Sequence, residues 1–234
     1  MNLLFFSFLT FLSLLSSSST NNFNVEGGNA QKKVKRIAFR TFLKNNGLSL
    51  DPKIPNKFES LQSNNKYSNH YFNFGTDLPD NWEIDRGYAL NTVIRSFSTD
   101  TGSQISVIVI PYESTKGHQD FQQNPIKYLD KTFGGSYLKS MKKTILQNIT
   151  GSPFDFSVST KRVRSISYAV FSYKYVEVTD NEEVEFTSSQ YQTNLWNTIF
   201  TFNYSVPSIF YSESTILEVL NKTNYINPNT PISE

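Results

Sequence analysis

The stretch Ile105–Tyr112 reads ISVIVIPY, and it decides the fold of this chain. In an extended segment, Ile108 and Ile110 lie on one face, and the isoleucine and valines at the odd-numbered positions lie on the other. A strand that is apolar on both faces is covered from both sides. The stretch therefore predicts a central strand of a sheet.

The segments on either side of this strand continue the pattern. Val93–Phe97 predicts a shorter strand, and Asp100–Ser103 (DTGS) is typical of the connection in a hairpin. Downstream, Asn124 and Pro125 predict the start of a helix, with Asn as the cap and Pro at the first helical position. Apolar residues at helical spacing continue to Ile145.

The second half of the chain predicts long strands that follow one another directly. Alternating or apolar runs at Phe154–Val158, Ile166–Val178, Val184–Tyr191 and Ile199–Tyr204 are joined by short polar turns, which is typical of an antiparallel meander. Ser208–Leu220 ends in a pattern that predicts a closing helix. The order of strands, helix, meander and helix predicts the α+β class, with a long antiparallel meander sheet flanked by helices.

The amino-terminal residues predict export. Met1–Leu15 is an uncharged run with about 13 apolar-dominated positions, fewer than the roughly 20 that span a bilayer, and small residues follow it. Residues 1–19 are therefore expected to be a signal peptide, and the mature protein is expected in the periplasm or outside the cell. An uncleaved anchor is the alternative, because no Lys or Arg precedes the run.

Residues 20–67 have the composition of a flexible basic arm, rich in Asn, Ser, Lys and Gly. The chain has 22 bases and 20 acids, and six of the bases lie within residues 31–44, so the rest holds 22 − 6 = 16 bases against 20 acids. A nucleic-acid-binding domain carries its bases on its folded part, so nucleic acid is not an expected partner. The arm is instead expected to be attracted weakly to a membrane surface through Lys32, Lys33, Lys35, Arg36, Arg40 and Lys44.

The rest of the chain is expected to form a folded domain over residues 68–222 and a loose tail over residues 223–234. An aromatic strand at Tyr71–Phe74 leads to the pattern F-x-x-x-L-P-x-x-W, formed by Phe74, Leu78, Pro79 and Trp82. With ISVIVIPY, the helix and the meander after it, this layout resembles the PsbP-like fold. That family includes extrinsic photosystem II proteins, DcrB-type lipoproteins and Mog-type Ran-binding proteins, and the chain is most similar to secreted members from Bacteroidetes-type bacteria.

The resemblance implies a fold, an exported protein and a non-enzymatic role. No metal-binding or partner-binding residue of that family matches a position in this sequence. The chain also lacks the usual chemistry-bearing motifs: it has no Cys, no phosphate-binding glycine motif and no nucleophile elbow. Its two histidines, His70 and His118, are not paired at metal-binding spacing and are interpreted as loop residues.

Two acidic groups are interpreted as turn residues. They are Asp77 with Asp80, and the run of Asp180, Glu182, Glu183 and Glu185. A carboxylate pair acting on sugars, or a weak calcium site in the second group, is the alternative. Trp82 is expected to close one end of the core, and Trp196 lies in a connection where an exposed indole would indicate a ligand surface.

We therefore assign no catalytic, cofactor-binding or metal-binding residue from the sequence and expect no cofactor. The predicted function is that of an exported, non-enzymatic binding or assembly-support protein of the cell envelope, whose partner is an unidentified protein or envelope component. The alternative hypothesis is a hydrolase whose site forms only when the chain folds.

Overall fold

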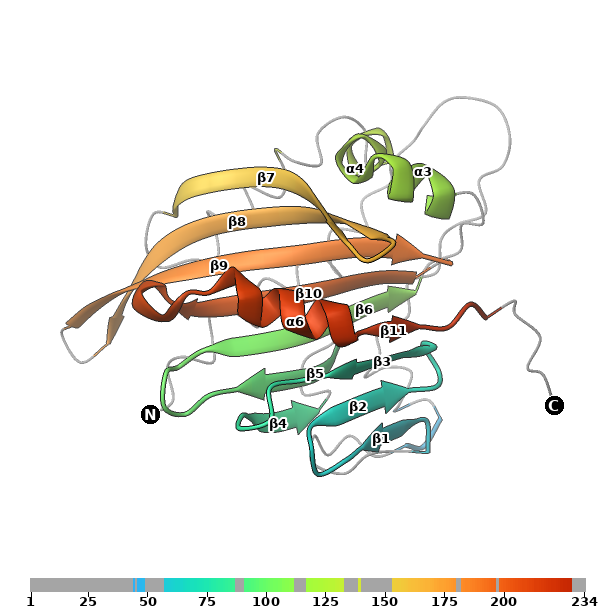
Figure 1. Ribbon diagram of the computed structural model, residues 1–234, viewed down its shortest axis with the longest axis horizontal. Helices are drawn as coiled ribbons and strands as arrows, with labels where there is room; N and C mark the ends of the chain where they lie inside the picture. Colours follow the sequence, from blue (N-terminus) through green and yellow to red (C-terminus); the bar gives the residue numbers. More distant parts are fainter. Residues whose placement is uncertain are drawn as a thin grey trace.

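The structure is a computed structural model, and it describes residues 44, 46–48, 57–86, 91–111, 117–132, 139, 153–179, 182–196 and 198–228. The predicted signal peptide and most of the basic arm lie outside these residues, as do Asp180 and most of the apolar run between residues 133 and 145. Among the described residues, the chain forms two antiparallel sheets and the helices that pack on them (Figure 1).

The larger sheet contains seven strands within the described part of the chain. These are β4 (Glu83–Arg86), β5 (Thr92–Phe97), β6 (Gln104–Pro111), β7 (Phe154–Val163), β8 (Ile166–Thr179), β9 (Glu182–Leu195) and β10 (Thr198–Pro207). Their spatial order is β4-β5-β6-β10-β9-β8-β7, and every neighbouring pair is antiparallel. The predicted meander is thus confirmed, and so is the α+β class.

The strand predicted from ISVIVIPY is central, as expected. β6 lies between β5 and β10, and Ile105, Val107 and Ile108 are at most 1% exposed. The hairpin that joins β5 to β6 turns at Gly102, which has a φ of +68° that L-amino acids rarely adopt. The predicted DTGS connection therefore supplies its glycine where the backbone requires it.

One face of the large sheet packs against α6 (Glu213–Lys222) and the small sheet (Figure 1). The core on this side is rich in aromatic rings from β8, β9 and β10, and α6 adds Ile216, Val219 and Leu220. The closing helix was predicted, although it begins later than expected. The short 3₁₀ helix η2 (Ser208–Phe210) occupies the start of the predicted segment.

The opposite face of the sheet packs against α3 (Gly117–Gln123) and α4 (Pro125–Thr132). Phe121 and Leu129 from these helices are buried against Phe171 and its neighbours on β8. α4 begins at the predicted Pro125, and the Asn124 side-chain oxygen accepts a hydrogen bond from the Lys127 N–H at 3.1 Å. α3 lies in a region that had been interpreted as a polar loop.

The small sheet was not predicted. Its strands in the described residues are β1 (Glu59–Leu61), β2 (Lys66–Asn69), β3 (Phe74–Asp77) and β11 (Asn224–Tyr225), in the order β1-β2-β3-β11. It packs on the large sheet through the Phe74 ring, whose centroid lies 5.3 Å from that of Phe200 on β10.

The predicted strand at Tyr71–Phe74 is wrong, because the chain turns there between β2 and β3. Asn73 has a φ of +54°, a conformation typical of turns that Asn tolerates better than most residues. Ordered strands also lie on both sides of the expected boundaries at residues 68 and 222, since β1 precedes the first and β11 follows the second.

Candidate binding surface

The two histidines lie on different elements, and neither is placed with a metal-binding group. His70 is exposed at the end of β2. His118 is half-buried on α3, where its Nδ1 lies 3.3 Å from the Asn194 carbonyl oxygen and its ring stacks on Trp196 with a centroid distance of 5.5 Å. Within the described residues, no group of three or more His, Asp or Glu side chains could hold a metal ion.

Neither tryptophan forms an exposed ligand surface, because both are half-buried and pack against the core between α6 and the large sheet. Asp77 and Asp80 flank the turn before Trp82, as predicted. The Asn65 side chain stabilises this turn by donating hydrogen bonds to the carbonyl oxygens of Pro79 at 2.6 Å and Trp82 at 2.9 Å. The conformation of the turn is thus set by an amide from a neighbouring loop.

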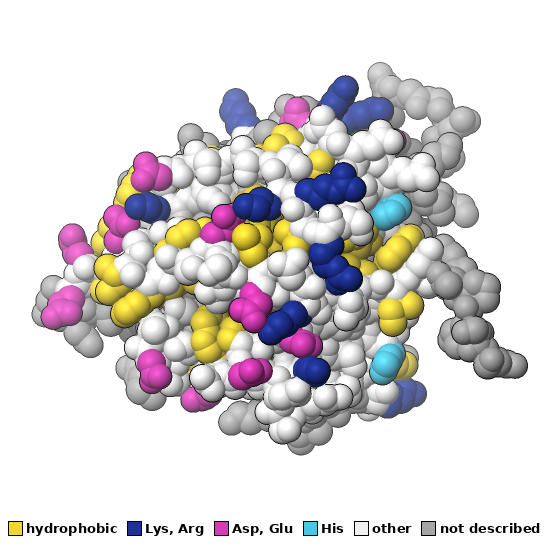
Figure 2. Space-filling model, in the orientation of Figure 1, with side chains coloured by type: hydrophobic (Ala, Val, Ile, Leu, Met, Phe, Trp, Pro, Cys, Tyr) yellow, Lys and Arg dark blue, Asp and Glu magenta, His cyan; other side chains and the backbone are white. Residues whose placement is uncertain are grey.

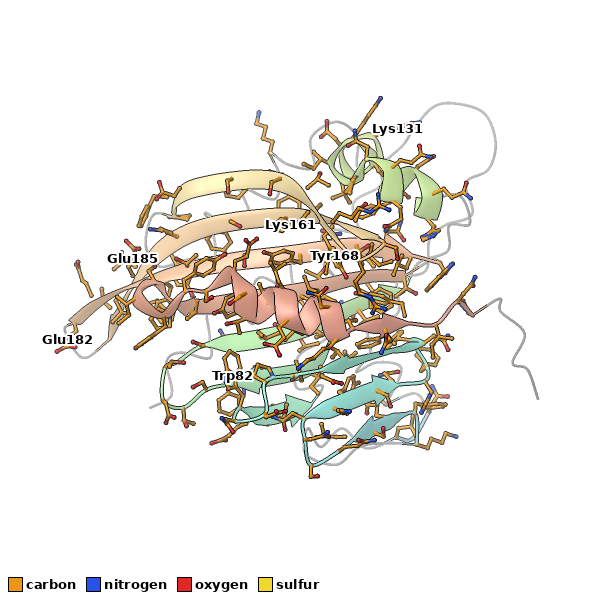
Figure 3. The ribbon with its side chains drawn as sticks, in the orientation of Figure 1. Trp82, Lys131, Lys161, Tyr168, Glu182 and Glu185 are labelled. Atoms are coloured by element: carbon orange, nitrogen blue, oxygen red, sulfur yellow. The ribbon has the colours of Figure 1, made fainter. Side chains whose placement is uncertain are left out.

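A network of tyrosines and charges lies where α6 crosses β9 and β7. Tyr191 donates its hydroxyl to Glu213 at 3.0 Å, and Lys161 Nζ lies 3.1 and 3.2 Å from the two oxygens of the same carboxylate. Figure 3 labels Lys161 and Tyr168 on the strands beside α6. Burial raises the pKa of Tyr191 and the hydrogen bond to Glu213 raises it further, while burial raises the pKa of Tyr168 to about 12. These hydroxyls stay protonated at neutral pH, so they serve as hydrogen-bond donors rather than as bases.

Another group of side chains lies at the free end of the β8–β9 hairpin. β10 ends at Pro207, opposite Phe186 of β9, so residues 182–185 of β9 extend past β10 and pair with β8 alone. Pro207 cannot donate a ladder hydrogen bond, and the chain leaves the sheet there to form η2. η2 stays beside β9, since the hydroxyls of Ser208 and Thr187 are 2.8 Å apart.

Large apolar side chains are exposed at this end. Ile209 is 85% exposed, Val178 is 70% exposed and Phe210 is 49% exposed. Single exposed apolar residues are common on protein surfaces, whereas neighbouring ones mark interaction sites. We call the set of Val178, Ile209, Phe210, Tyr211 and the surrounding acids the hairpin-end surface.

The acids at the hairpin end lie on two faces. Glu183 and Glu185 lie on the same face of the β8–β9 hairpin as η2, because they alternate with Thr187, which contacts Ser208; Glu177 and Glu182 project from the opposite face. Lys174, which lies 3.1 Å from Glu185, is the base nearest to these acids in the β8–β9 pairing, so the hairpin end carries a formal charge of −3 over both faces and −1 on the face of η2. Hydrogen bonds from Ser208 and Lys174 lower the pKa of Glu185, and burial raises that of Glu177. Figure 2 shows acidic and hydrophobic side chains together at the left end of the molecule, where Figure 3 labels Glu182 and Glu185.

Sequence reasoning assigned three of these acids to a turn and did not find the apolar part of the surface. The structure places Glu182, Glu183 and Glu185 in β9, paired with β8, so the interpretation of these three acids as turn residues is wrong. In the sequence, Ile209 and Phe210 are indistinguishable from core residues. The signal that could have located them is Pro207, which ends a strand and is followed, after Ser208, by two consecutive large apolar residues.

No family model matches the sequence, and the comparison with curated proteins found no match. Among solved structures, the chain is similar to a protein from Bacteroides thetaiotaomicron at 12% identity and a TM-score of 0.44, covering 68% of this chain and 47% of that one. The solution structure of cyanobacterial PsbP (CyanoP) from Synechocystis sp. PCC 6803 has 13% identity and a TM-score of 0.43, and covers 69% of this chain and 91% of that one. LpqN, described as involved in cell envelope biogenesis of Mycobacterium tuberculosis, has 10% identity and a TM-score of 0.38, and covers 64% and 81%.

PsbP, which belongs to the family that the sequence resembles, is therefore among the similar structures. The chain spans about half the length of the Bacteroides protein, at 47% of it. Identities this low concern the fold, so no function follows from them. No helix in the described part of the chain is long and apolar enough to cross a membrane.

Proposed function

We propose that this protein is an exported, non-enzymatic binding protein of the cell envelope, and that the hairpin-end surface binds a basic, partly apolar segment of a partner protein. The observation that carries this proposal is the exposure of Ile209 and Phe210 on η2, on the face of the hairpin that presents Glu183 and Glu185. Contiguous exposed apolar groups with a polar rim are typical of protein-binding surfaces.

The chemistry of the partner follows from the charges of the surface. The hairpin end carries a formal charge of −3 over its two faces, which attracts bases and repels acids, and like charges placed together across an interface are costly. The apolar part needs an apolar counterpart, because burying Ile209 or Phe210 against a polar surface would gain little. An amphipathic segment with Lys or Arg on one side and aliphatic or aromatic groups on the other supplies both.

The non-enzymatic part of the proposal is supported by what surrounds each reactive side chain. Tyr191 is held as a donor to Glu213, and His118 is stacked on Trp196. The hydroxyl beside Glu213 belongs to a tyrosine whose pKa is raised by burial, and His118 faces a carbonyl oxygen and an indole ring. The hydrolase alternative has no observation in its favour, and turnover of substrate in a broad hydrolase screen would revive it.

A direct test uses the full chain and a synthetic amphipathic helix of Lys and Leu, with fluorescence anisotropy as the readout. We expect the peptide to bind, and a matched peptide with Glu in place of Lys not to bind. Replacing Ile209 and Phe210 together by Ser should weaken binding by about tenfold or more, because each buried side chain of this size contributes roughly 1.5–3 kcal/mol. Ile226→Ser is the control, since Ile226 is 57% exposed elsewhere on the molecule. Equal losses in both variants, or equal binding of both peptides, would contradict the proposal.

Export is tested separately by mass spectrometry of the native protein. The mature chain is expected to begin between Ser16 and Gln31, because small residues follow the apolar run that ends at Leu15. Intact Met1 on the native soluble protein would contradict this part of the proposal and would leave the binding surface unaffected.

A further inference from the structure

We infer that the segment bound by the hairpin-end surface is the basic stretch of residues 31–44 from a second copy of this chain. The inference rests on the proposed function, since it names the partner of the same surface. The stretch contains six bases and no acid. It also contains Ile37, Phe39 and Phe42, so it combines the positive charge and the apolar groups that the surface requires.

Charge complementarity carries the choice of occupant. Outside residues 31–44 the chain has 16 bases against 20 acids, so its positive charge is concentrated in this stretch. At the hairpin end acids are in excess of bases, and Glu183 and Glu182 are both exposed, the first on the face of η2 and the second on the opposite face. Complementary charges of this kind steer association and fix the orientation of the partners.

The position of the two regions in the fold indicates a second copy rather than a contact within one molecule. The basic stretch precedes β1 in the chain, and Leu48, four residues after its end, packs against the core. Figure 1 shows β1 at the lower right and the free end of the β8–β9 hairpin at the far left. A stretch that starts near one side of the molecule and binds the other side of its neighbour links copies head to tail, and such contacts build rings or open chains.

Two variants of the full chain separate this arrangement from any symmetric association. The first replaces all six bases of residues 31–44 by Gln and leaves the hairpin-end surface intact. The second carries Glu182→Lys with Glu183→Lys and keeps the basic stretch. A control with Asp80→Lys and Asp120→Lys changes the net charge by the same amount at two other exposed acids.

Sedimentation velocity should be measured at about 0.01 M salt, where charges act over about 30 Å, and at about 0.15 M, where they act over about 8 Å. We expect the unmodified chain and the control to self-associate at low salt, with association at least about tenfold weaker at the higher salt. Each of the two variants should be monomeric alone. Mixed together, they should form one-to-one dimers, because each then supplies the part that the other lacks.

Several outcomes would overturn the inference. These are a monomeric unmodified chain at low salt, self-association of either variant alone, or a mixture that stays monomeric. Loss of binding to phosphatidylserine-containing vesicles in the first variant, without any self-association of the unmodified chain, would assign the basic stretch to anionic lipid. If the Lys–Leu peptide still binds the hairpin-end surface while copies do not associate, the proposed function stands and this inference fails.

Discussion

Tyr191 on β9 donates its hydroxyl to the Glu213 carboxylate on α6 across 3.0 Å, and this contact joins the closing helix to the middle of the large sheet. Tyr191 is buried, whereas the pair formed by Lys161 and Glu213 is 40% and 44% exposed. The same carboxylate therefore takes part in two interactions with different environments, and their contributions to stability can be compared directly.

Tyr191→Phe should lower the free energy of unfolding by about 1.5 kcal/mol, because it removes a hydrogen bond to a charged group from a buried ring. Lys161→Met should cost less than about 1 kcal/mol, since solvent-exposed ion pairs contribute little. Urea denaturation of both variants measures the difference. A larger loss for Lys161→Met would mean that the ion pair, not the tyrosine, holds α6 on the sheet.

The buried tyrosines predict that the protein loses stability in alkali. The pKa of Tyr168 rises from 10.0 to about 12 on folding, chiefly through burial. The folded-state pKa is higher than the unfolded-state one. The stability that this difference contributes is therefore fully present below pH 10 and is lost as the pH rises toward 12. The free energy of unfolding should fall by roughly 2.7 kcal/mol through Tyr168, at about 1.36 kcal/mol per pKa unit.

Tyr168→Phe should therefore unfold with a shallower dependence on pH between 10 and 12, which thermal melts at a series of pH values would show. Ultraviolet absorbance of tyrosinate should rise together with unfolding in the unmodified chain. Burial also raises the pKa values of Tyr173, Tyr175 and Tyr191, so the remaining slope should still be steep. An unchanged pH dependence in Tyr168→Phe would contradict the assignment.

Elements that depend on local pattern were predicted well. ISVIVIPY predicted a doubly covered strand and Asn124 with Pro125 predicted the start of a helix, because burial and capping leave direct marks in the sequence. β1 and β2 left no such mark. They are strands of three and four residues with mostly polar side chains, and the edge of their sheet is completed by β11 from the other end of the chain.

α3 was missed for a related reason. Its sequence, GHQDFQQ, contains one large apolar residue, Phe121, which is 0% exposed. A single buried side chain produces no periodicity. Polar contacts across the fold hold the helix instead: the Gln122 Nε2 donates to Thr193 Oγ1 at 2.9 Å, and its Oε1 accepts from the Ser167 N–H at 2.7 Å.

Ile108→Asp tests the central strand. The side chain of Ile108 is 1% exposed and contacts Ile110 and Ile199, so the variant would place a carboxylate among apolar groups. The expected cost is several kcal/mol, from lost burial and from desolvation of the charge. Ile226→Asp serves as the control at an exposed position. A drop in melting temperature of less than about 3 °C for Ile108→Asp, the shift of roughly 1 kcal/mol, would show that β6 is not deeply covered.

Two serines on the large sheet give a matched test of buried hydroxyls. Ser96 on β5 is 0% exposed, and its Oγ has no hydrogen-bond partner among the described residues. Ser205 on β10 is 1% exposed, and its Oγ lies 3.0 Å from the hydroxyl of Tyr175. The two residues share size and burial and differ in whether the hydroxyl is paired.

Ser96→Ala should leave stability unchanged or raise it by up to about 1 kcal/mol, because the variant removes a desolvated group that gains nothing in the folded state. Ser205→Ala should lower stability by about 1–3 kcal/mol, because it leaves the buried Tyr175 hydroxyl without this partner. Chemical denaturation of both variants under one condition gives the comparison. If Ser96→Ala were the more destabilising of the two, its hydroxyl would have to be bonded in solution, most simply to a buried water, and β5 would then carry an internal polar site beside the core.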